Sequence, residues 1–171
     1  MSQAVVPHTD QLTTFWVAGH YFGVPVAVVQ EVLRFQAMTR VPLAPPVVRG
    51  LINLRGQIVT AIDLRRRLGL PERPPERRPM NVVLRIDDSA VSLLVDEIGE
   101  VMEVERSRFE PPPDTLRSFG RELVRGVYKL PEHLLLVLDA ARAIDIDAAK
   151  YLEAKYAENV PGSRVYDRTT H

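Results

Sequence analysis

The residues best placed to do chemistry form a run of carboxylates in the middle of the chain. They are Asp96, Glu97, Glu100, Glu103 and Glu105. Two carboxylates held side by side can act as general acid and base, because each raises the proton affinity of the other. These carboxylates alternate with apolar residues such as Ile98 and Val101, the pattern of an element with one wet face. We therefore expect a solvated face here and no catalytic dyad.

The histidines and cysteines give no second reactive site. His8, His20, His133 and His171 are scattered, without a metal-ligand partner three or four residues away in a helix. The chain has no cysteine, which excludes thiolate metal sites, disulfides and a cysteine nucleophile. Neither a GxGxxG nor a GxxxxGK[ST] nucleotide loop occurs. We expect no enzymatic activity, no metal and no cofactor.

Arginines gather just before and within a proline-rich stretch and could contact phosphates. They are Arg65, Arg66, Arg67, Arg73, Arg77 and Arg78. Nucleic-acid modules usually add stacking aromatics or a recognition helix, and neither is interleaved here. The 22 basic and 22 acidic side chains also balance, so no long-range field draws nucleic acid or an anionic membrane. We expect a solvated edge and no nucleic-acid partner.

Another arginine, Arg55, stands beside Gly56 between two apolar runs in GLINLRGQIVTAIDLRRRLG (50–69). The pattern predicts a β-hairpin whose tight turn contains both residues, with Gly56 supplying a positive φ. Either the arginine merely decorates this turn, or the hairpin displays it to a partner.

Many short strands separated by glycine and proline predict a mainly β protein, a barrel or a sandwich. The expected strands span 12–17, 21–26, 47–54, 58–62, 80–86, 90–95, 98–104, 122–130 and 133–138. Apolar residues at helical spacing predict a short helix over 27–35, and another over 64–68 that ends at Gly69. The stretch PERPPERRP (71–79) has no apolar periodicity and reads as a loop.

The chain contains a weak internal repeat. VRGLINLRGQIVTAIDLRRRL (48–68) aligns without gaps with VRGVYKLPEHLLLVLDAARAI (124–144), 76 residues later. GVPVAVVQEVLRF (23–35) aligns with SLLVDEIGEVMEV (92–104), 69 residues later. This favours two copies of a β-rich unit of about 65 to 75 residues, each a small barrel; coincidence among apolar strands is the alternative. Units this small should pack together and leave a groove between them.

Length and composition favour a folded, soluble, cytoplasmic protein. The chain has 171 residues, and 46% of them are hydrophobic. The N-terminal segment lacks the basic and apolar regions of a signal peptide. No window reaches the roughly 18 to 20 apolar residues that span a bilayer.

Three motifs together resemble the CheW family of bacterial chemotaxis coupling proteins. They are RGLINLRGQIV-x-x-IDLR-x-RLG (49–69), VQEVLR (29–34) and LLVDEIGEVMEV (93–104), and the resemblance covers about residues 10–146. It implies two pseudo-symmetric, five-stranded SH3-like β-barrels with short helices. The approximate lobes are residues 10–70 and 80–146, with exchange of strands between the lobes as an alternative.

The resemblance also implies a function. Such a protein is a non-enzymatic adaptor that couples the cytoplasmic tips of methyl-accepting chemoreceptors to the regulatory domain of a CheA-type histidine kinase in a signalling array. It has no nucleic-acid partner and does not insert into the membrane. A small-ligand-binding sensory β-barrel is the alternative, disfavoured because small barrels are filled by their own side chains.

Residues at the family's partner-sensitive positions are candidates for partner binding. They are Val29, Glu31, Asn53, Leu54, Arg55 and Gly56. The resemblance implies that Glu31 and Arg55 lie close together, and we predict an ion pair between them. The second copy has Pro131-Glu132 in place of Arg-Gly, so the lobes should present different surfaces.

The C-terminal extension, 147–171, has good helix formers in DAAKYLEAKYAEN (147–159), followed by Pro161 and Gly162. We expect a helix and then a frayed tail. The helix either docks onto the barrels or adds a binding element.

Overall fold

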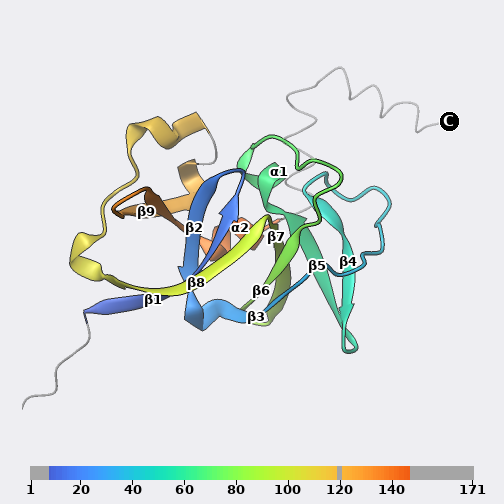
Figure 1. The fold of residues 1–171 in the computed structure, drawn as a ribbon. Helices are drawn as coiled ribbons and strands as arrows, with labels where there is room; N and C mark the ends of the chain where they lie inside the picture. The colour runs from blue at the N-terminus through green and yellow to red at the C-terminus, as the bar shows by residue number, and fades with distance from the viewer. Residues whose placement is uncertain (1–7, 119–120, 147–171) are drawn as a thin grey trace, which may run out of the picture.

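The fold is built from two five-stranded β-sheets (Figure 1). The structure is a computed structural model that describes residues 8–118 and 121–146. One sheet has the strand order β8-β1-β2-β10-β9, and the other has the order β3-β6-β7-β5-β4. These sheets are referred to below as sheet A and sheet B. The mainly β, SH3-like fold expected from the sequence is confirmed.

The strands agree closely with those expected. They are β1 (Thr9–Val17), β2 (His20–Pro25), β3 (Val29–Leu33), β4 (Val48–Leu54), β5 (Gln57–Asp63), β6 (Met80–Ile86), β7 (Ser89–Val95), β8 (Glu97–Glu105), β9 (Val124–Lys129) and β10 (Leu134–Leu138). The α-helices are α1 (Leu64–Leu68) and α2 (Ala140–Ile144), and the short 3-10 turns are η1 (Val26–Val28), η2 (Arg106–Arg108), η3 (Asp114–Ser118) and η4 (Arg121–Leu123). The extension 147–171, with its expected helix, lies outside the described residues.

The expected helix over 27–35 is wrong. Only Val26–Val28 form a single 3-10 turn, and Val29–Leu33 form strand β3, which pairs antiparallel with β6. Valines at 28, 29 and 32 lose side-chain freedom in a helix and fit a pleated strand better. Pairing with β6 satisfies the backbone of this segment, so tertiary contacts decide against the local helical spacing.

The internal repeat appears in the topology. Strands β1 to β5 of the first copy correspond to β6 to β10 of the second, and each copy supplies strands to both sheets. Sheet A holds β1 and β2 with β8, β9 and β10, and sheet B holds β6 and β7 with β3, β4 and β5. The two parallel pairs, β2 with β10 and β5 with β7, join strands from different copies. The sheets therefore do not follow the chain halves 10–70 and 80–146.

Both repeats also start their α-helix in the same way. Asp63 caps α1 by accepting a hydrogen bond from the backbone N–H of Arg65, and Asp139 caps α2 by accepting from that of Arg142. The aligned aspartates thus supply the side-chain oxygen that helix starts require. α1 ends at Gly69, as the sequence predicted, and the φ of 75° at this glycine is left-handed.

The sheets are open and not closed barrels. Within the described residues, no strand pairing joins β8 to β9 or β3 to β4. The edges β4 and β9 instead pair with the chain that leads into them, through the bridges Thr39–Leu51 and Glu110–Val127. Each bridge has two backbone hydrogen bonds of 2.8 and 2.9 Å. These bonds use edge groups that barrel closure would need.

The main core is shared by both sheets. Alternate residues of each strand face it, for example Phe15 and Phe22 from sheet A and Val82 and Leu93 from sheet B. The intervening residues form a smaller cluster on the other face of each sheet, around Tyr21 and Leu135 in sheet A and around Ile52 and Leu94 in sheet B. Because successive side chains point to opposite faces of a sheet and each face carries a buried cluster, the central strands are apolar on both faces.

Candidate partner-binding surface

The turn between β4 and β5 holds Arg55 in an unusual backbone conformation. Arg55 has a φ of 52° and Gly56 a φ of 91°, so both turn residues are left-handed. Two-residue hairpin turns of this kind match the twist of the strands. The side-chain oxygen of Asn53 accepts a hydrogen bond of 2.8 Å from the N–H of Gly56 and closes the turn. The positive φ of Gly56 was expected, whereas that of Arg55 was not.

The predicted ion pair between Arg55 and Glu31 is confirmed. The guanidinium Nη2 of Arg55 bonds the carboxylate Oε2 of Glu31. Glu31 lies on β3 and Arg55 follows β4, the two edge strands of sheet B, so the pair links edges that do not pair through their backbones. The Arg55 side chain is still 70% exposed. The pair therefore fixes the arginine without covering it.

The other candidate residues divide into displayed and supporting ones. Asn53 and Gly56 are exposed at the turn. Leu54 is buried among Ile52 and Val59, and Val29 is partly buried against the main core. These last two side chains hold the surface in place.

Two exposed apolar residues were missed by the sequence reasoning. Ile58 is 60% exposed and lies opposite Asn53 in the β4–β5 register. Val32 is an exposed residue of β3. A signal for Ile58 was present, because it alternates along β5 with the fully buried Val59. We call Arg55, Ile58 and their neighbours Glu31 and Asn53 the RG-turn surface.

The second repeat carries the same apolar pair with different charges. Val101 aligns with Val32 and is 57% exposed, and Leu134 aligns with Ile58 and is also exposed. The turn residues here are Pro131 and Glu132, so no arginine faces Glu100, the counterpart of Glu31. A depression of about 350 Å³ beside them includes Glu100, Glu132 and His133. The β4–β5 hairpin with β3 and the β9–β10 hairpin with β8 thus both expose apolar side chains. Of these two ends of the molecule, only the first carries the Arg–Glu pair.

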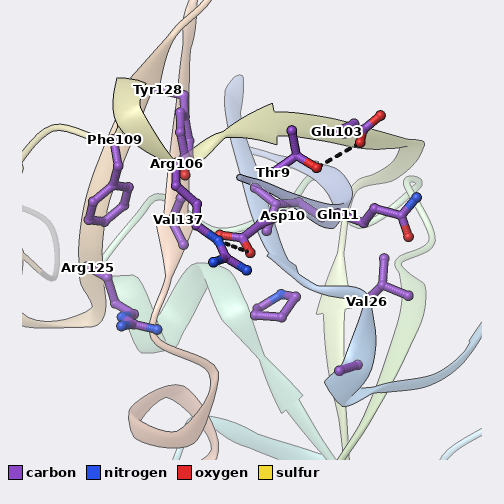
Figure 2. Close-up of a pocket in the computed structure, with 13 residues that line it drawn as sticks. Thr9, Asp10, Gln11, Val26, Glu103, Arg106, Phe109, Arg125, Tyr128 and Val137 are labelled. Atoms are coloured by element: carbon purple, nitrogen blue, oxygen red, sulfur yellow. Dashed lines mark hydrogen bonds and ion pairs between the residues drawn. The ribbon is translucent and has the colours of Figure 1, made fainter. Parts of the chain in front are cut away.

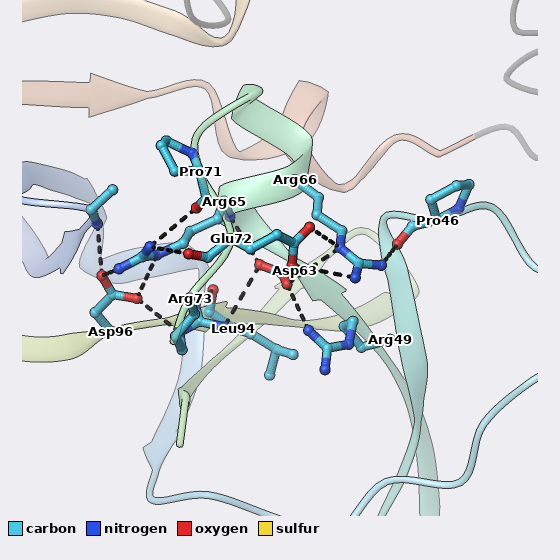
Figure 3. Close-up of polar contacts among 11 residues, drawn as sticks. Pro46, Arg49, Asp63, Arg65, Arg66, Pro71, Glu72, Arg73, Leu94 and Asp96 are labelled. Carbon is cyan, nitrogen blue, oxygen red and sulfur yellow. Dashed lines mark hydrogen bonds and ion pairs between the residues drawn. The ribbon is translucent and has the colours of Figure 1, made fainter. Parts of the chain in front are cut away.

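Asp96 does not belong to a solvated face. It follows β7, is buried, and accepts hydrogen bonds from Arg65 (2.6 and 3.1 Å), Arg73 (2.9 Å) and the backbone N–H of Ala18 (2.7 Å) (Figure 3). Burial acts to raise the pKa of Asp96, but these hydrogen bonds outweigh it and hold the pKa below its usual range. Asp96 is therefore a structural anion. The solvated-face prediction is correct for the exposed Glu97, Glu100, Glu103 and Glu105.

The expectation of a solvated arginine edge is likewise wrong for Arg65 and Arg73. Both are buried, and Arg65 also donates to the carbonyls of Pro71 and Glu72 at 3.1 and 3.0 Å. Buried arginines need carboxylates, and Asp63 and Asp96 supply them. Because Ala18 lies in the turn that joins strands β1 and β2 of sheet A, and Asp96 follows β7 of sheet B, this cluster ties the loop 71–79 to both sheets.

The part of the chain that the structure describes holds no group of three or more metal-ligating side chains. None of its helices has the length and apolar character to cross a bilayer.

Comparison with known proteins agrees with the fold and the motifs. A family model described as the CheW-like domain matches residues 11–148. The chain is 31% identical over 140 residues to chemotaxis protein CheW of Treponema pallidum (strain Nichols), covering 80% of this chain and 82% of that protein. It is 30% identical over 141 residues to chemotaxis protein CheW of Bacillus subtilis (strain 168), covering 82% and 90%. The crystal structure of the scaffolding protein TtCheW from Thermoanaerobacter tengcongensis superposes with a TM-score of 0.73 at 25% identity, covering 84% of this chain and 96% of that one.

Proposed function

This chain belongs to the CheW family, and from that premise we propose that it is a non-catalytic adaptor joining cytoplasmic chemoreceptor tips to the regulatory domain of a CheA-type histidine kinase. Such an adaptor works in the cytoplasm, within receptor arrays. It acts by surface complementarity and needs neither a metal nor a cofactor.

The observation that carries this proposal is the RG-turn surface. A non-glycine residue with a positive φ is uncommon and is kept only where its surroundings hold it. Here the residue with the positive φ is an arginine, and its side chain stays exposed beside the exposed Ile58. Arginine next to apolar surface is a typical composition for a binding hot spot. Display thus accounts for Arg55 better than decoration does.

The pseudo-symmetry supports a coupling role, because an adaptor must hold two partners at once. Ile58 and Leu134 expose apolar surface at the hairpin of each sheet, where a kinase regulatory domain of similar fold could pack end to end. Val32 and Val101 are exposed on the edge strands β3 and β8. Apolar residues of this kind suit the packing of a helical receptor tip in a groove.

Substitution of Arg55 by alanine tests the proposal. We expect the affinity for the kinase regulatory domain, for a receptor-tip fragment, or for both to fall by about tenfold, as for an interface arginine of moderate weight. Thermal unfolding should change little, because an exposed ion pair stabilises by only about 0 to 1 kcal/mol. Arg108→Ala, at an exposed arginine paired with Glu105, is the matched control. Unchanged affinity for both partners would overturn the proposal.

A further inference from the structure

A hollow of about 940 Å³ opens beside sheet A and is not part of the surface described above (Figure 2). The start of β1, the end of β2 with η1, and β9 border it. Its apolar wall includes Leu12, Val26, Val137 and the ring of Phe109, which is 41% exposed. Its volume falls in the range of small-molecule sites.

Two hydrogen-bond donors line this hollow without a protein partner among the described residues. Tyr128 is only 5% exposed, and its hydroxyl makes no hydrogen bond there. Burial raises the pKa of Tyr128, with a further contribution from the negative charge of Asp10, so the phenol keeps its proton and can donate. Arg125 is exposed, and its guanidinium has no carboxylate partner there. The buried Tyr128 hydroxyl, left unpaired, costs free energy that an acceptor oxygen would recover.

A β-bulge brings these donors to the same hollow. Val137 pairs with Gly126 and Leu138 with Val124, which leaves Arg125 without a partner in β10. A regular strand would turn residues 125 and 128 to opposite faces. The bulge removes this difference, and both side chains line the cavity.

The carboxylates in the lining are already engaged. Asp10 pairs with Arg106 at 2.9 Å, and Glu103 accepts a hydrogen bond of 2.8 Å from the Thr9 hydroxyl (Figure 2). Among the described residues, Arg125 is therefore the charged lining side chain with neither a hydrogen-bond nor an ion-pair partner, whereas Glu103 keeps its negative charge beside the neutral Thr9 hydroxyl. An anion fits its charge better than a cation does.

The first repeat has an apolar side chain and a paired arginine at the equivalent positions. Tyr128 aligns with Ile52, a fully apolar core residue. Arg125 aligns with Arg49, which pairs with Asp63 at 2.9 Å. In the second repeat, Asp139 pairs with Arg142 instead of with Arg125. The fold thus accommodates apolar or paired groups at these positions, whereas the second repeat has a buried hydroxyl and an exposed guanidinium without protein partners among the described residues.

We infer that this hollow binds a small organic acid, with its apolar body against Phe109, Leu12 and Val137, its carboxylate on Arg125, and an acceptor oxygen on the Tyr128 hydroxyl. This site is separate from the RG-turn surface. It would add ligand sensing to the adaptor and does not depend on the coupling role.

The test is an amide NMR titration of the full chain with benzoate, phenylacetate and 3-phenylpropionate, each matched with its neutral amide. We expect saturable shifts at residues 9–12 and 125–128 with at least one acid, and binding of that acid weakened about tenfold in its amide and in Arg125→Gln. Tyr128→Phe removes a single hydroxyl and should weaken binding several-fold, and the variant's own spectrum reports whether it is folded. Arg108→Gln, outside the lining, should bind like the unchanged protein.

Three results would overturn this inference. One is the absence of saturable shifts with all three acids. Another is equal binding of acid and amide, which would indicate an apolar hollow without an anion site. The third is full affinity in both Arg125→Gln and Tyr128→Phe. None of these results would bear on partner binding by the RG-turn surface.

Discussion

At the scale of single residues, the molecule treats its charges in two opposite ways. Arg55 is held outward by a strained turn and by Glu31, whereas Arg65 and Arg73 are buried against Asp96. An exposed pair contributes little to stability, and a buried one is costly to break. Substitutions at the two kinds of site should therefore affect different measurements.

The Arg55–Glu31 pair should matter for binding and not for stability. Arg55→Glu and Glu31→Arg each place like charges together and should weaken partner binding by about tenfold. The double reversal restores an ion pair and should recover part of the affinity. Binding is measured by calorimetry with the kinase regulatory domain and with a receptor-tip fragment. If the double variant binds no better than either single variant, the pair does not shape the contact.

Asp96→Asn should destabilise the protein by about 3 to 5 kcal/mol at neutral pH, since it leaves the buried Arg65 without a carboxylate and Arg73 with only the more distant Asp63, 3.8 Å away. Because the pKa of Asp96 is lowered in the folded state, its contribution is present above the ordinary aspartate pKa, about 3.9, and is lost as pH falls through the lower folded value. Urea unfolding at several pH values should therefore show the two proteins converging in acid. Glu97→Gln, at an exposed pair with Arg77, is the control. A constant difference across this range would contradict the assignment.

At the scale of elements, the edge strands β4 and β9 each depend on a close approach of the chain that precedes them. A Cβ added at Gly126 would lie 2.6 Å from the carbonyl oxygen of Glu110 and 2.2 Å from Cζ of Phe109. At Gly50, the equivalent Cβ would lie 2.6 Å from the carbonyl oxygen of Thr39. The two glycines align in the repeat, so in both sheets a glycine lets the preceding chain pack closely against an edge strand.

Alanine at Gly126 or Gly50 should therefore destabilise the protein by about 1 to 3 kcal/mol, the usual effect of overpacking. Hydrogen exchange should accelerate at Val127 or Leu51, whose N–H groups bond the displaced segment. Gly56→Ala is the matched comparison, because its Cβ would meet open space and only its φ of 91° carries a cost. Protection unchanged at both bridges would show that the segments do not need these glycines.

At the scale of the whole molecule, a duplicated unit presents two related ends with one shared core. Each copy gives strands to both sheets, so neither half of the chain contains a complete sheet. The buried cluster around Asp96 and the shared core both cross from one sheet to the other. We expect the two ends to move as one body, which suits a scaffold that must hold partners at fixed positions.

Polar substitutions at the exposed apolar residues should separate the partners. The single variants Ile58→Ser and Leu134→Ser should each weaken binding of the kinase regulatory domain. The single variants Val32→Ser and Val101→Ser should each weaken binding of a receptor tip. Each loss should reach about tenfold for an interface residue of ordinary weight. The melting temperature should change little, because these side chains are already exposed. Light scattering of the three-component mixture would report loss of the ternary complex, and intact assembly with all four variants would contradict this division.

Much of the fold and of the RG-turn surface could be predicted from the sequence, because the features concerned are local. Alternating apolar residues marked nearly every strand, and the Arg55–Gly56 turn and the helix end at Gly69 carry short-range signals. The repeat marked pairs of equivalent positions. The helix expected over 27–35 failed because β-branched valines at helical spacing suit a strand equally well, and only pairing with β6 selects between them.

What the sequence by itself determined was therefore the strands other than β3, the repeat and the residues at the RG turn. The tertiary structure alone decided the exchange of strands between sheets, the burial of Arg73 and Asp96, and the hollow beside Tyr128. Alternation and turn chemistry act over a few residues, so they can be read along the chain. Asp96 meets Ala18 across 78 residues and Arg65 across 31, and no local pattern encodes contacts of that separation.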